Sequence, residues 1–262
     1  KTTSYEVCFV TEEKWKQLVE FIHRKFGSVD GPGVRYIYFL HGCPLRCQFC
    51  HNPDTWGSKK YEEYTPEKAL QQAMKYKTYW GKKGGITISG GEPLAQIDFV
   101  LELFKLAKKG EINTCIDTSG GCFTREEPFF SKFNELMEYT DLLLVDIKEI
   151  NNEKSALTGR SNENILDMAR YLSEIDKPIW IRHVLVPERS DYDEDLIELD
   201  LYFTLSNVYR VEILPYHTLG VFKWEELNIP YQLEGIKPPV KERVENAKRL
   251  LHVDRYTRYL DN

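Results

Sequence analysis

Apolar residues fall into short runs that alternate with amphipathic stretches along most of the chain. The runs, such as residues 86–88 and 142–145, have the length of a strand and are almost continuously apolar. Between them, apolar residues recur three and four positions apart, as over residues 100–107, which is the period of a helix. Strands buried on both faces and separated by helices are typical of parallel sheets. The pattern therefore predicts an α/β fold.

Strand–helix units follow one another in this pattern, and no repeat or linker divides them. The strands are predicted at residues 34–40, 86–89, 112–117, 142–146, 179–186 and 208–214. The helices are predicted at residues 65–79, 100–107, 128–139, 162–174, 193–205 and 244–251. Right-handed crossovers would curl such units into a partial (β/α)6 TIM-like barrel, because about eight units are needed to close one.

A further helix is predicted before the first strand, over residues 11–25. Thr11 can cap this helix, and apolar residues recur along it at helical spacing. We expect the whole chain to be a single domain. Its parts are an amino-terminal extension with this helix (1–26), the barrel core (27–238) and a carboxyl-terminal helix (239–262).

Composition narrows the class of protein. The chain has 262 residues, 42% of them hydrophobic and 29% charged, as in an ordinary globular domain. A formal net charge of −6 and the lack of a basic cluster argue against nucleic acid as a partner. The longest apolar runs are too short to cross a membrane, and the first residues lack the apolar core of a signal peptide. We therefore expect a cytoplasmic protein, whose thiols stay reduced.

Half of the cysteines are clustered directly after the apolar run at residues 34–40. Cys43, Cys47 and Cys50 form a C-x3-C-x2-C pattern at the carboxyl end of this predicted strand, which is the active edge of an α/β barrel. Three thiolates can hold three irons of a [4Fe–4S] cluster, which normally takes four cysteine ligands. A missing fourth cysteine would leave one iron open to another ligand.

Two other arrangements of these cysteines remain open. A structural zinc site could use the same spacing with His51 as a nitrogen ligand, although no second pair of ligands follows. Buried or disulfide-bonded cysteines are the other arrangement. The chain shows no secretory signal, and Cys8, Cys115 and Cys122 stand apart from one another. The spacing favours the cluster.

Polar residues or glycines follow every predicted strand. They are the three clustered cysteines, Gly90-Gly91-Glu92, Asp117-Thr118, Asp146 with Lys148, Arg182-His183, and His217. Each alone could be a turn, a helix cap or a satisfied surface group. At the carboxyl ends of barrel strands such residues are typical of function. Together they predict a pocket with backbone N–H groups at the glycines, carboxylates for an ammonium or hydroxyl group, and Lys148 for a carboxylate.

These motifs resemble the radical S-adenosylmethionine (SAM) superfamily. The resemblance rests on the cysteine pattern, with the aromatic Phe49 before its last cysteine, and on GGEP at residues 90–93. Within the superfamily, the chain is similar to the pyruvate formate-lyase activating enzymes from about residue 27 to 239. This similarity is carried by VDGPGVR (29–35), CHNPDTW (50–56), DTSG (117–120), DIK (146–148), WIR (180–182) and LPYHTLG (214–220).

The resemblance implies roles for residues of this chain. Cys43, Cys47 and Cys50 would ligate the cluster, and SAM would chelate the open iron through its amino and carboxylate groups. The residues implied in SAM binding are Phe49, His51, Gly90, Gly91, Glu92, Asp146, Ile147, Lys148 and His217. Those implied in binding a monovalent cation, Na⁺ or K⁺, are Asp117, Thr118 and Asp146. Those implied in binding a peptide loop of the partner are Asp30, His51 and Arg182.

The chemistry that the resemblance implies is the formation of a glycyl radical. The reduced cluster would cleave SAM to methionine and a 5′-deoxyadenosyl radical, which would abstract hydrogen from a glycine Cα of pyruvate formate-lyase. A flavodoxin or ferredoxin would donate the electron, and the chain would act as a monomer. No cysteine lies between Cys50 and Gly90, which favours the single-cluster activating enzymes over relatives with a ferredoxin-like insertion.

Three alternatives remain. The chain could activate a different glycyl-radical enzyme, or it could be a radical SAM enzyme that acts on a small molecule. It could also be a zinc-binding α/β protein without catalysis. The wide lateral opening expected of a six-unit barrel favours a protein loop over a small molecule as the substrate.

Overall fold

The computed structural model describes residues 21–27, 30–57, 62–151, 157–203 and 207–260. Within them, seven strands form one sheet in which each strand pairs with the next along the chain. They are β1 (Phe21–Gly27), β2 (Arg35–Leu40), β3 (Gly85–Gly90), β4 (Asn113–Thr118), β5 (Leu142–Asp146), β6 (Ile179–Leu185) and β7 (Val208–Pro215). Strands β2 to β7 are parallel and form an open sheet, so the predicted partial barrel is confirmed.

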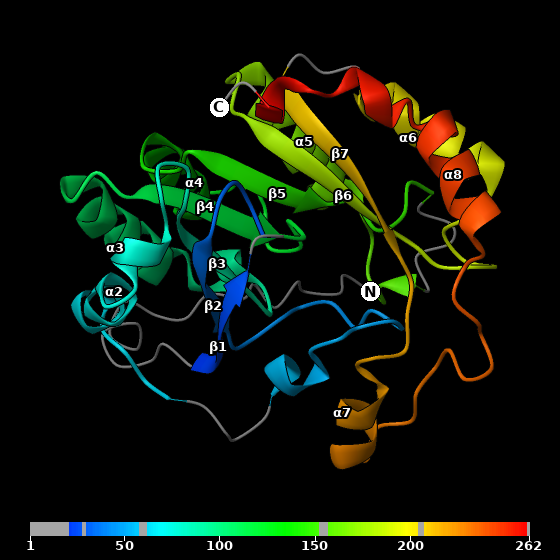
Figure 1. Cartoon of the computed structure of the whole chain (residues 1–262), viewed down its shortest axis with the longest axis horizontal. Helices are drawn as coiled ribbons and strands as arrows, with labels where there is room; N and C mark the ends of the chain where they lie inside the picture. The colour runs from blue at the N-terminus through cyan, green and yellow to red at the C-terminus, as the bar shows by residue number, and fades with distance from the viewer. Residues whose placement is uncertain (1–20, 28–29, 58–61, 152–156, 204–206, 261–262) are drawn as a thin grey trace.

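Helices of the described residues pack outside the curved sheet (Figure 1). They are α2 (Pro66–Met74), α3 (Ile97–Lys109), α4 (Phe129–Glu138), α5 (Glu163–Glu174), α6 (Asp193–Phe203), α7 (Val221–Glu226) and α8 (Lys241–Leu250). Helix α3 contacts α2, α4 and β4, whereas α8 contacts α6 and β7. Helix α7 stands apart from the others and contacts the short 3-10 helix η1 (Pro53–Trp56).

The residues predicted to begin and bury the helices have these roles in the structure. The Thr65 hydroxyl accepts the N–H of Lys68 at 3.3 Å, and Pro66 occupies the first turn of α2. The apolar side chains of α3 other than Leu106 are buried, and the helix contacts β4 and α4. The helix predicted over residues 65–79 ends earlier, at Met74, and a separate 3-10 turn covers Lys77–Tyr79.

The helix predicted over residues 11–25 is wrong at its carboxyl end. Residues 11–20 lie outside the described residues, whereas Phe21–Gly27 forms β1, which pairs antiparallel with β2. Without β1, this edge of β2 would present unpaired backbone N–H and C=O groups. Helical spacing is a local signal, and pairing with a neighbouring strand overrode it here.

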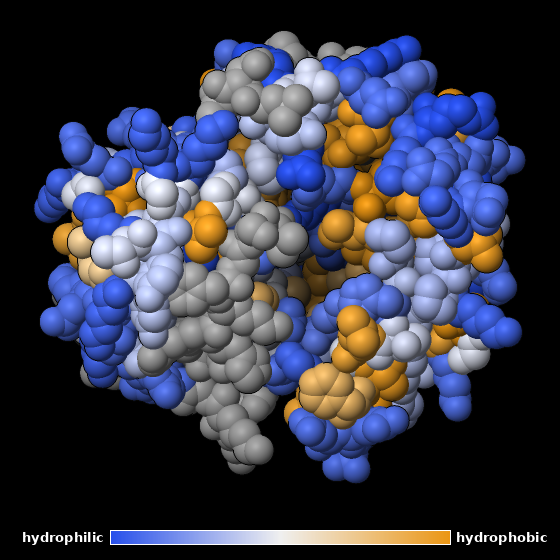
Figure 2. Space-filling view, in the orientation of Figure 1, coloured by the Kyte–Doolittle hydropathy of each residue, from blue (hydrophilic) through white to orange (hydrophobic). Residues whose placement is uncertain are grey.

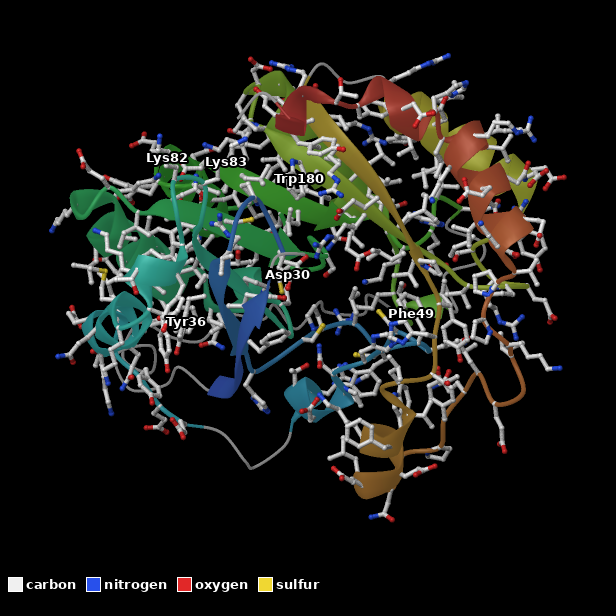
Figure 3. All side chains as sticks on the ribbon, viewed as in Figure 1. Asp30, Tyr36, Phe49, Lys82, Lys83 and Trp180 are labelled. Carbon is white, nitrogen blue, oxygen red and sulfur yellow. The ribbon has the colours of Figure 1, made fainter. Side chains whose placement is uncertain are left out.

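The concave side of the sheet is closed at one end and open at the other. The guanidinium of Arg210 stacks on the rings of Trp180 and Tyr259, with 4.8 and 4.5 Å to the ring centroids, and covers the amino-terminal end. In Figure 3, Lys82 and Lys83 lie before β3 at this end, and Phe49 lies toward the opposite end. The open end therefore coincides with the carboxyl ends of the parallel strands, where function is expected in a barrel.

Candidate active site

A cavity of about 420 Å³ opens at the carboxyl ends of the parallel strands. Figure 2 shows the surface hollowed beside α7, with hydrophobic side chains on part of the wall. The predicted residues on the wall are Asp30, Cys43, Cys47, Phe49, Cys50, His51, Gly90, Gly91, Asp117, Thr118, Asp146, Lys148 and His217. Glu92, Ile147 and Arg182 are buried and do not line the cavity. The structure thus brings together polar groups from loops that are far apart in the sequence.

The cysteine loop, residues 41–52, has a well-defined backbone. The N–H groups of Arg46 and Gln48 donate to the carbonyls of the segment 157–158, at 2.8 and 2.9 Å. The guanidinium of Arg46 donates to the carbonyl of Cys43 at 2.7 Å. Because these bonds fix the main chain between the first and last cysteine, the three thiols are presented to the cavity in a defined arrangement.

Burial governs the protonation of these thiols. It raises the pKa of Cys43 to about 12, and it also raises the pKa values of Cys47 and Cys50 above the ordinary range. The positive charge of Lys148 acts in the opposite direction on all three but is weaker than the effect of burial. Thiolates are the metal-binding form, and bound iron would supply the positive charge that stabilises them. The three thiols therefore fit a metal cluster.

A single metal ion fits less well. Among the described residues, no group of three or more His, Cys, Asp and Glu side chains converges closely enough to hold one ion. A mononuclear zinc site gathers its ligands around one ion, whereas a [4Fe–4S] cube spreads its cysteines over separate irons. The arrangement of donors favours the cluster over zinc.

The Gly90-Gly91 pair brings backbone onto the cavity wall. The N–H of Gly91 donates to the carbonyl of Leu40 at 2.8 Å, and the N–H of Glu92 donates to the carbonyl of Gly42 at 2.7 Å. A Cβ on Gly90 would lie 2.2 Å from the nitrogen of Leu40, and one on Gly91 would lie 2.1 Å from the oxygen of Gly42. Any side chain here would separate the end of β3 from the cysteine loop.

The carboxylate of Glu92 points away from the cavity and joins two strand ends. It accepts hydrogen bonds from the Thr118 hydroxyl at 2.5 Å, from the Leu94 N–H at 3.1 Å, and from the Ser119 N–H at 3.0 Å. The residue is fully buried. These bonds tie the end of β3 to the end of β4, so Glu92 fixes the glycine turn that lines the cavity.

An ion pair between Asp146 and Lys148 lies on the cavity wall beneath the ring of Phe49. Lys148 Nζ contacts Asp146 Oδ2 and lies 5.3 Å from the centroid of Phe49. Burial lowers the pKa of Lys148, but the charge of Asp146 and its hydrogen bond with Lys148 raise it more, so the group stays charged. Asp146 Oδ1 is buried and accepts no hydrogen bond from the described residues. An oxygen of this kind is suited to a cation.

Arg182 holds three carboxylates below the cavity. Its Nη1 lies 3.1 Å from Asp30 Oδ1 and 3.4 Å from Asp117 Oδ1, and its Nε donates to Glu212 Oε2 at 2.9 Å. Burial raises the pKa of Asp117 to about 6, although Arg182 and a hydrogen bond from Ser89 oppose the rise. Figure 3 places Asp30 inside the curve of the sheet. Two of the predicted peptide-binding residues, Asp30 and Arg182, are thus in contact.

The third predicted peptide-binding residue, His51, lies elsewhere on the wall. Its ring packs on that of His217, with 4.1 Å between centroids, and its Nε2 lies 3.1 Å from the His217 carbonyl oxygen. Burial lowers the pKa of His51, so the ring is neutral at physiological pH. This pair joins the cysteine loop to the segment that follows β7.

The comparison with known families agrees with this geometry. A model described as the Radical SAM superfamily matches residues 37–199. The chain belongs to this superfamily. Membership implies a [4Fe–4S] cluster and SAM as cofactors, which the three thiols at the open end of the barrel fit.

Curated relatives within the radical SAM superfamily match nearly the whole chain. A pyruvate formate-lyase-activating enzyme of Streptococcus mutans is 54% identical over 238 residues, 89% of this chain and 90% of that protein. One of Listeria monocytogenes is 52% identical over 233 residues, 88% of this chain and 94% of that protein. One of Staphylococcus epidermidis is 51% identical over 230 residues, 86% and 92% respectively.

Solved structures of radical SAM proteins share the fold at low identity. Streptococcus suis SuiB bound to S-adenosylmethionine has a TM-score of 0.62 and 18% identity, over 84% of this chain and 47% of that one. A domain of a pyruvate-formate lyase-activating enzyme from Bacteroides vulgatus has a TM-score of 0.54 and 21% identity, over 66% of this chain and 96% of that one. The family match and the curated relatives, rather than this shared fold, decide against a non-catalytic zinc-binding protein.

Three residues around the radical SAM site were missed by the sequence analysis. Ser89 donates to Asp117 Oδ2 at 2.7 Å, and its alternation with Thr87 on β3 could have indicated an inward position. Lys223 and Trp224 belong to α7, a six-residue helix with no periodic signal of its own. Their importance comes from contacts with the cysteine loop, which only the fold reveals.

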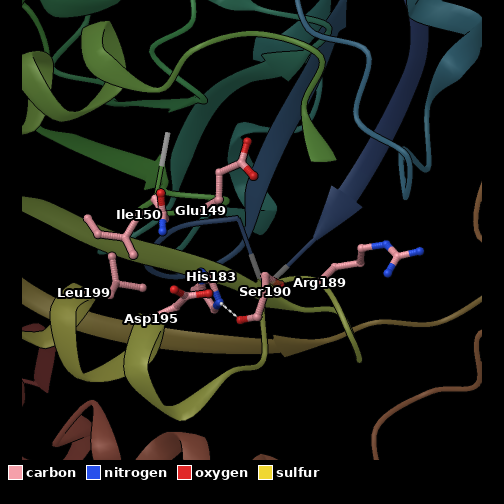
Figure 4. Close-up of a pocket in the computed structure, with 8 residues that line it drawn as sticks. Glu149, Ile150, His183, Arg189, Ser190, Asp195 and Leu199 are labelled. Atoms are coloured by element: carbon pink, nitrogen blue, oxygen red, sulfur yellow. Dashed lines mark hydrogen bonds between the residues drawn. The ribbon is translucent and has the colours of Figure 1, made fainter. Parts of the chain in front are cut away.

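A second, much smaller cavity of about 10 Å³ lies beside β6 (Figure 4). Glu149 and His183 line it. Burial raises the pKa of Glu149 to about 7, against the effect of a hydrogen bond with Thr158. The Thr158 hydroxyl lies 2.9 Å from both a Glu149 carboxyl oxygen and the Arg160 carbonyl oxygen. A hydroxyl has one proton, so both contacts are hydrogen bonds only when Glu149 is protonated.

No helix within the described part of the chain combines the length and the apolar character needed to span a bilayer.

Proposed function

We propose that this chain activates a pyruvate formate-lyase by installing a glycyl radical in it. The observation that carries the proposal is the group of three thiols on the cavity wall at the open end of the barrel, in a chain that is 54% identical to a pyruvate formate-lyase-activating enzyme. When bound, the reduced cluster supplies the electron that cleaves SAM to methionine and a 5′-deoxyadenosyl radical, which takes hydrogen from a glycine Cα.

The residues of this chain bind and orient the two cofactors. Cys43, Cys47 and Cys50 ligate the cluster and leave one iron for the amino and carboxylate groups of SAM. The backbone at Gly90-Gly91 and the ammonium of Lys148 face the amino-acid end of SAM. A charged lysine suits a carboxylate there.

The adenosine end of SAM lies against the rest of the wall. Phe49, His51 and His217 line the cavity and would contact the adenine and the ribose. Ile147 would take part in SAM binding through its main chain, whose carbonyl oxygen is in contact with the ring of His183. Glu92 would act on SAM only indirectly, by fixing the glycine turn. With SAM bound, these groups exclude water from the sulfonium and the cluster, which protects a reactive radical.

The oxygens of Asp117, Thr118 and Asp146 would hold a monovalent cation, Na⁺ or K⁺, which would offset the negative charge of the carboxylates there. The buried Asp146 Oδ1 supports this site, because it accepts no hydrogen bond from the described residues and a cation would supply a partner. The raised pKa of Asp117 also supports it, because a bound cation would stabilise the carboxylate.

The macromolecular partner enters through the lateral opening of the barrel. Asp30, which is paired with the buried Arg182, lies at one side of the cavity and His51 at another, so a peptide between Asp30 and His51 would pass over the SAM site. The chain acts as a monomeric single domain in the cytoplasm. Its electron comes from a flavodoxin or ferredoxin, because the site needs an external one-electron donor of low potential.

The test of this function is an anaerobic activation assay. The protein is reconstituted with iron and sulfide, reduced with dithionite, and mixed with SAM and pyruvate formate-lyase. We expect about four irons per chain, stoichiometric 5′-deoxyadenosine and the doublet of a glycyl radical in the electron paramagnetic resonance spectrum. Deoxyadenosine without the doublet would reject this partner. A protein that binds no iron and cleaves no SAM would reject the proposal altogether.

A further inference from the structure

The cysteine loop and α7 meet at the open side of the barrel, where the sheet itself does not close. The loop follows β2 and α7 follows β7, so the two come from strands that are not neighbours in the sheet. Gly220, at the start of α7, approaches the loop so closely that a Cβ there would lie 2.8 Å from the Cα of His51. The rings of Trp224 and Trp56 meet edge to face, 5.1 Å between centroids.

Two hydrogen bonds surround the third cysteine of the loop. The indole N–H of Trp224 donates to the carbonyl of Cys50 at 2.8 Å. The N–H of Asn52 donates to the sulfur of Cys50, with 3.4 Å between nitrogen and sulfur. Trp224 is fully buried, so its indole has no water to bond with instead. Cys50 is therefore held at both its main chain and its thiol.

An ion pair lies beside these bonds. Lys223 Nζ donates to the side-chain oxygen of Asn52 at 2.9 Å and lies 3.0 Å from Asp54 Oδ1. The side chains of Lys223 and Asp54 are only 17% and 18% exposed. Charges that are little exposed act on nearby groups with less screening than charges at the surface. Lys223 thus places one positive charge, and Asp54 one negative charge, close to Cys50.

We propose that Lys223 and Trp224 are positioning residues for the cluster. Trp224 holds the backbone of Cys50, and Lys223 holds Asn52 so that its N–H bonds to the Cys50 sulfur. The charge of Lys223, balanced by Asp54, also sets the reduction potential of the cluster. The inference rests on the proposed function, because it takes Cys50 to be a cluster ligand.

The physical basis is that reduction adds a negative charge to the cluster. A nearby positive charge and hydrogen bonds to cluster sulfur favour the reduced state, and a nearby negative charge opposes it. Removing the charge of Lys223 should therefore lower the potential, whereas removing the charge of Asp54 should raise it. A purely structural contact predicts instead that both changes disturb the loop in the same way.

The test is a redox titration of the reconstituted holoprotein, followed by electron paramagnetic resonance. The variants are Lys223→Met, Asp54→Asn and the double variant. At the wild-type midpoint, we expect the ratio of reduced to oxidised cluster to fall about threefold to tenfold in Lys223→Met and to rise by a similar factor in Asp54→Asn. A tenfold change corresponds to ~59 mV for one electron. The double variant should lie near the wild type.

The outcomes separate this inference from the proposed function. Shifts of the same sign in both single variants, or no shift in either, would overturn the inference while the cluster remains. A wild-type protein that takes up no cluster would overturn the proposed function instead. Lys248→Met is the matched control, because Lys248 pairs with Glu245 on the surface of α8 and does not line the cavity.

A second measurement tests the role of Trp224. Trp224→Phe keeps an aromatic ring and removes the N–H donor to Cys50. In the anaerobic holoprotein, hydrogen–deuterium exchange at residues 47–56 should become about tenfold faster, while exchange over α3 stays unchanged. Unchanged exchange at residues 47–56 would show that the indole hydrogen bond does not hold the loop.

Discussion

At the scale of single residues, the site combines groups whose charges are costly to bury. Three thiols have raised pKa values, and Asp146 has a buried oxygen without a hydrogen bond from the described residues. Lys148 lies between these two sets, paired with Asp146 and acting on all three thiols. Burying such groups without partners costs free energy in a protein that has no ligand bound. Groups of this kind are therefore typical of a site that binds ligands.

The cysteines give the first prediction. Cys47→Ala should lose the cluster and SAM cleavage but stay folded, because it removes one ligand and only a small buried group. Iron and sulfide analysis with circular dichroism checks this. Cys115→Ala is the matched control, since Cys115 is also buried and does not line the cavity. A Cys47→Ala protein that still cleaves SAM would contradict the ligand assignment.

Lys148 gives the second prediction. Lys148→Met keeps most of the apolar stem but removes the ammonium that pairs with Asp146 and that we propose faces the SAM carboxylate. Binding of SAM should weaken about tenfold or more, as expected for the loss of a hydrogen bond to a charged group. Equilibrium dialysis under anaerobic conditions measures this. Lys132→Met, which breaks the pair with Asp98 on the outer helices, should leave the affinity unchanged.

At the scale of elements, short segments outside the strands fix the cysteine loop. The segment 157–158 pairs with its backbone, and α7 contacts its far end. Asn162, before α5, donates its side-chain N–H groups to the carbonyls of Glu149 and Ile150 at 2.7 and 2.9 Å. The segment between β5 and α5 is therefore hydrogen-bonded to the loop that carries the thiols, and the two segments support each other's conformation.

Glu149 gives a prediction at this scale. Its pKa is raised to about 7 in the folded chain, so folding favours the protonated carboxyl. The stability that this contributes is full below the pKa of the unfolded chain, about 4.5, and is lost as the pH rises through about 7. From pH 5 to pH 8, the wild type should therefore lose about 2 kcal/mol of unfolding free energy relative to Glu149→Gln.

Urea unfolding of the two proteins at several pH values measures this difference. Parallel curves for the wild type and Glu149→Gln would mean that Glu149 titrates alike in the folded and unfolded chain. A difference that grows with rising pH in favour of the wild type would reverse the sign and contradict the burial argument.

At the scale of the whole molecule, the open barrel explains which parts could be predicted from the sequence. The apolar runs and crossover helices specify β2 to β7, because a strand buried on both faces leaves a local signature. The residues at the strand ends could be predicted to meet, because parallel strands share one active edge. The glycines at the end of β3 could also be recognised from the sequence. Only glycine allows the end of β3 to approach the backbone before the cysteines so closely.

Other features depend on contacts between distant segments and leave no local signal. The sequence of β1 suggests a helix, but the segment forms a strand because it pairs with the edge of β2. The helix α7 is too short for a period, and Lys223 and Trp224 gain their role only by meeting the cysteine loop. Glu92 could be placed near the site from its motif, but the direction of its carboxylate follows from Thr118 and Ser119.

The central claim is that this chain takes hydrogen from a glycine of its protein partner, and isotope transfer tests it most directly. Pyruvate formate-lyase is prepared with glycine deuterated at Cα and incubated anaerobically with the reduced chain and SAM. We predict that the 5′-deoxyadenosine formed carries deuterium, detected by mass spectrometry, in proportion to the glycyl radical. Deoxyadenosine that forms at the same rate without deuterium would contradict the claim.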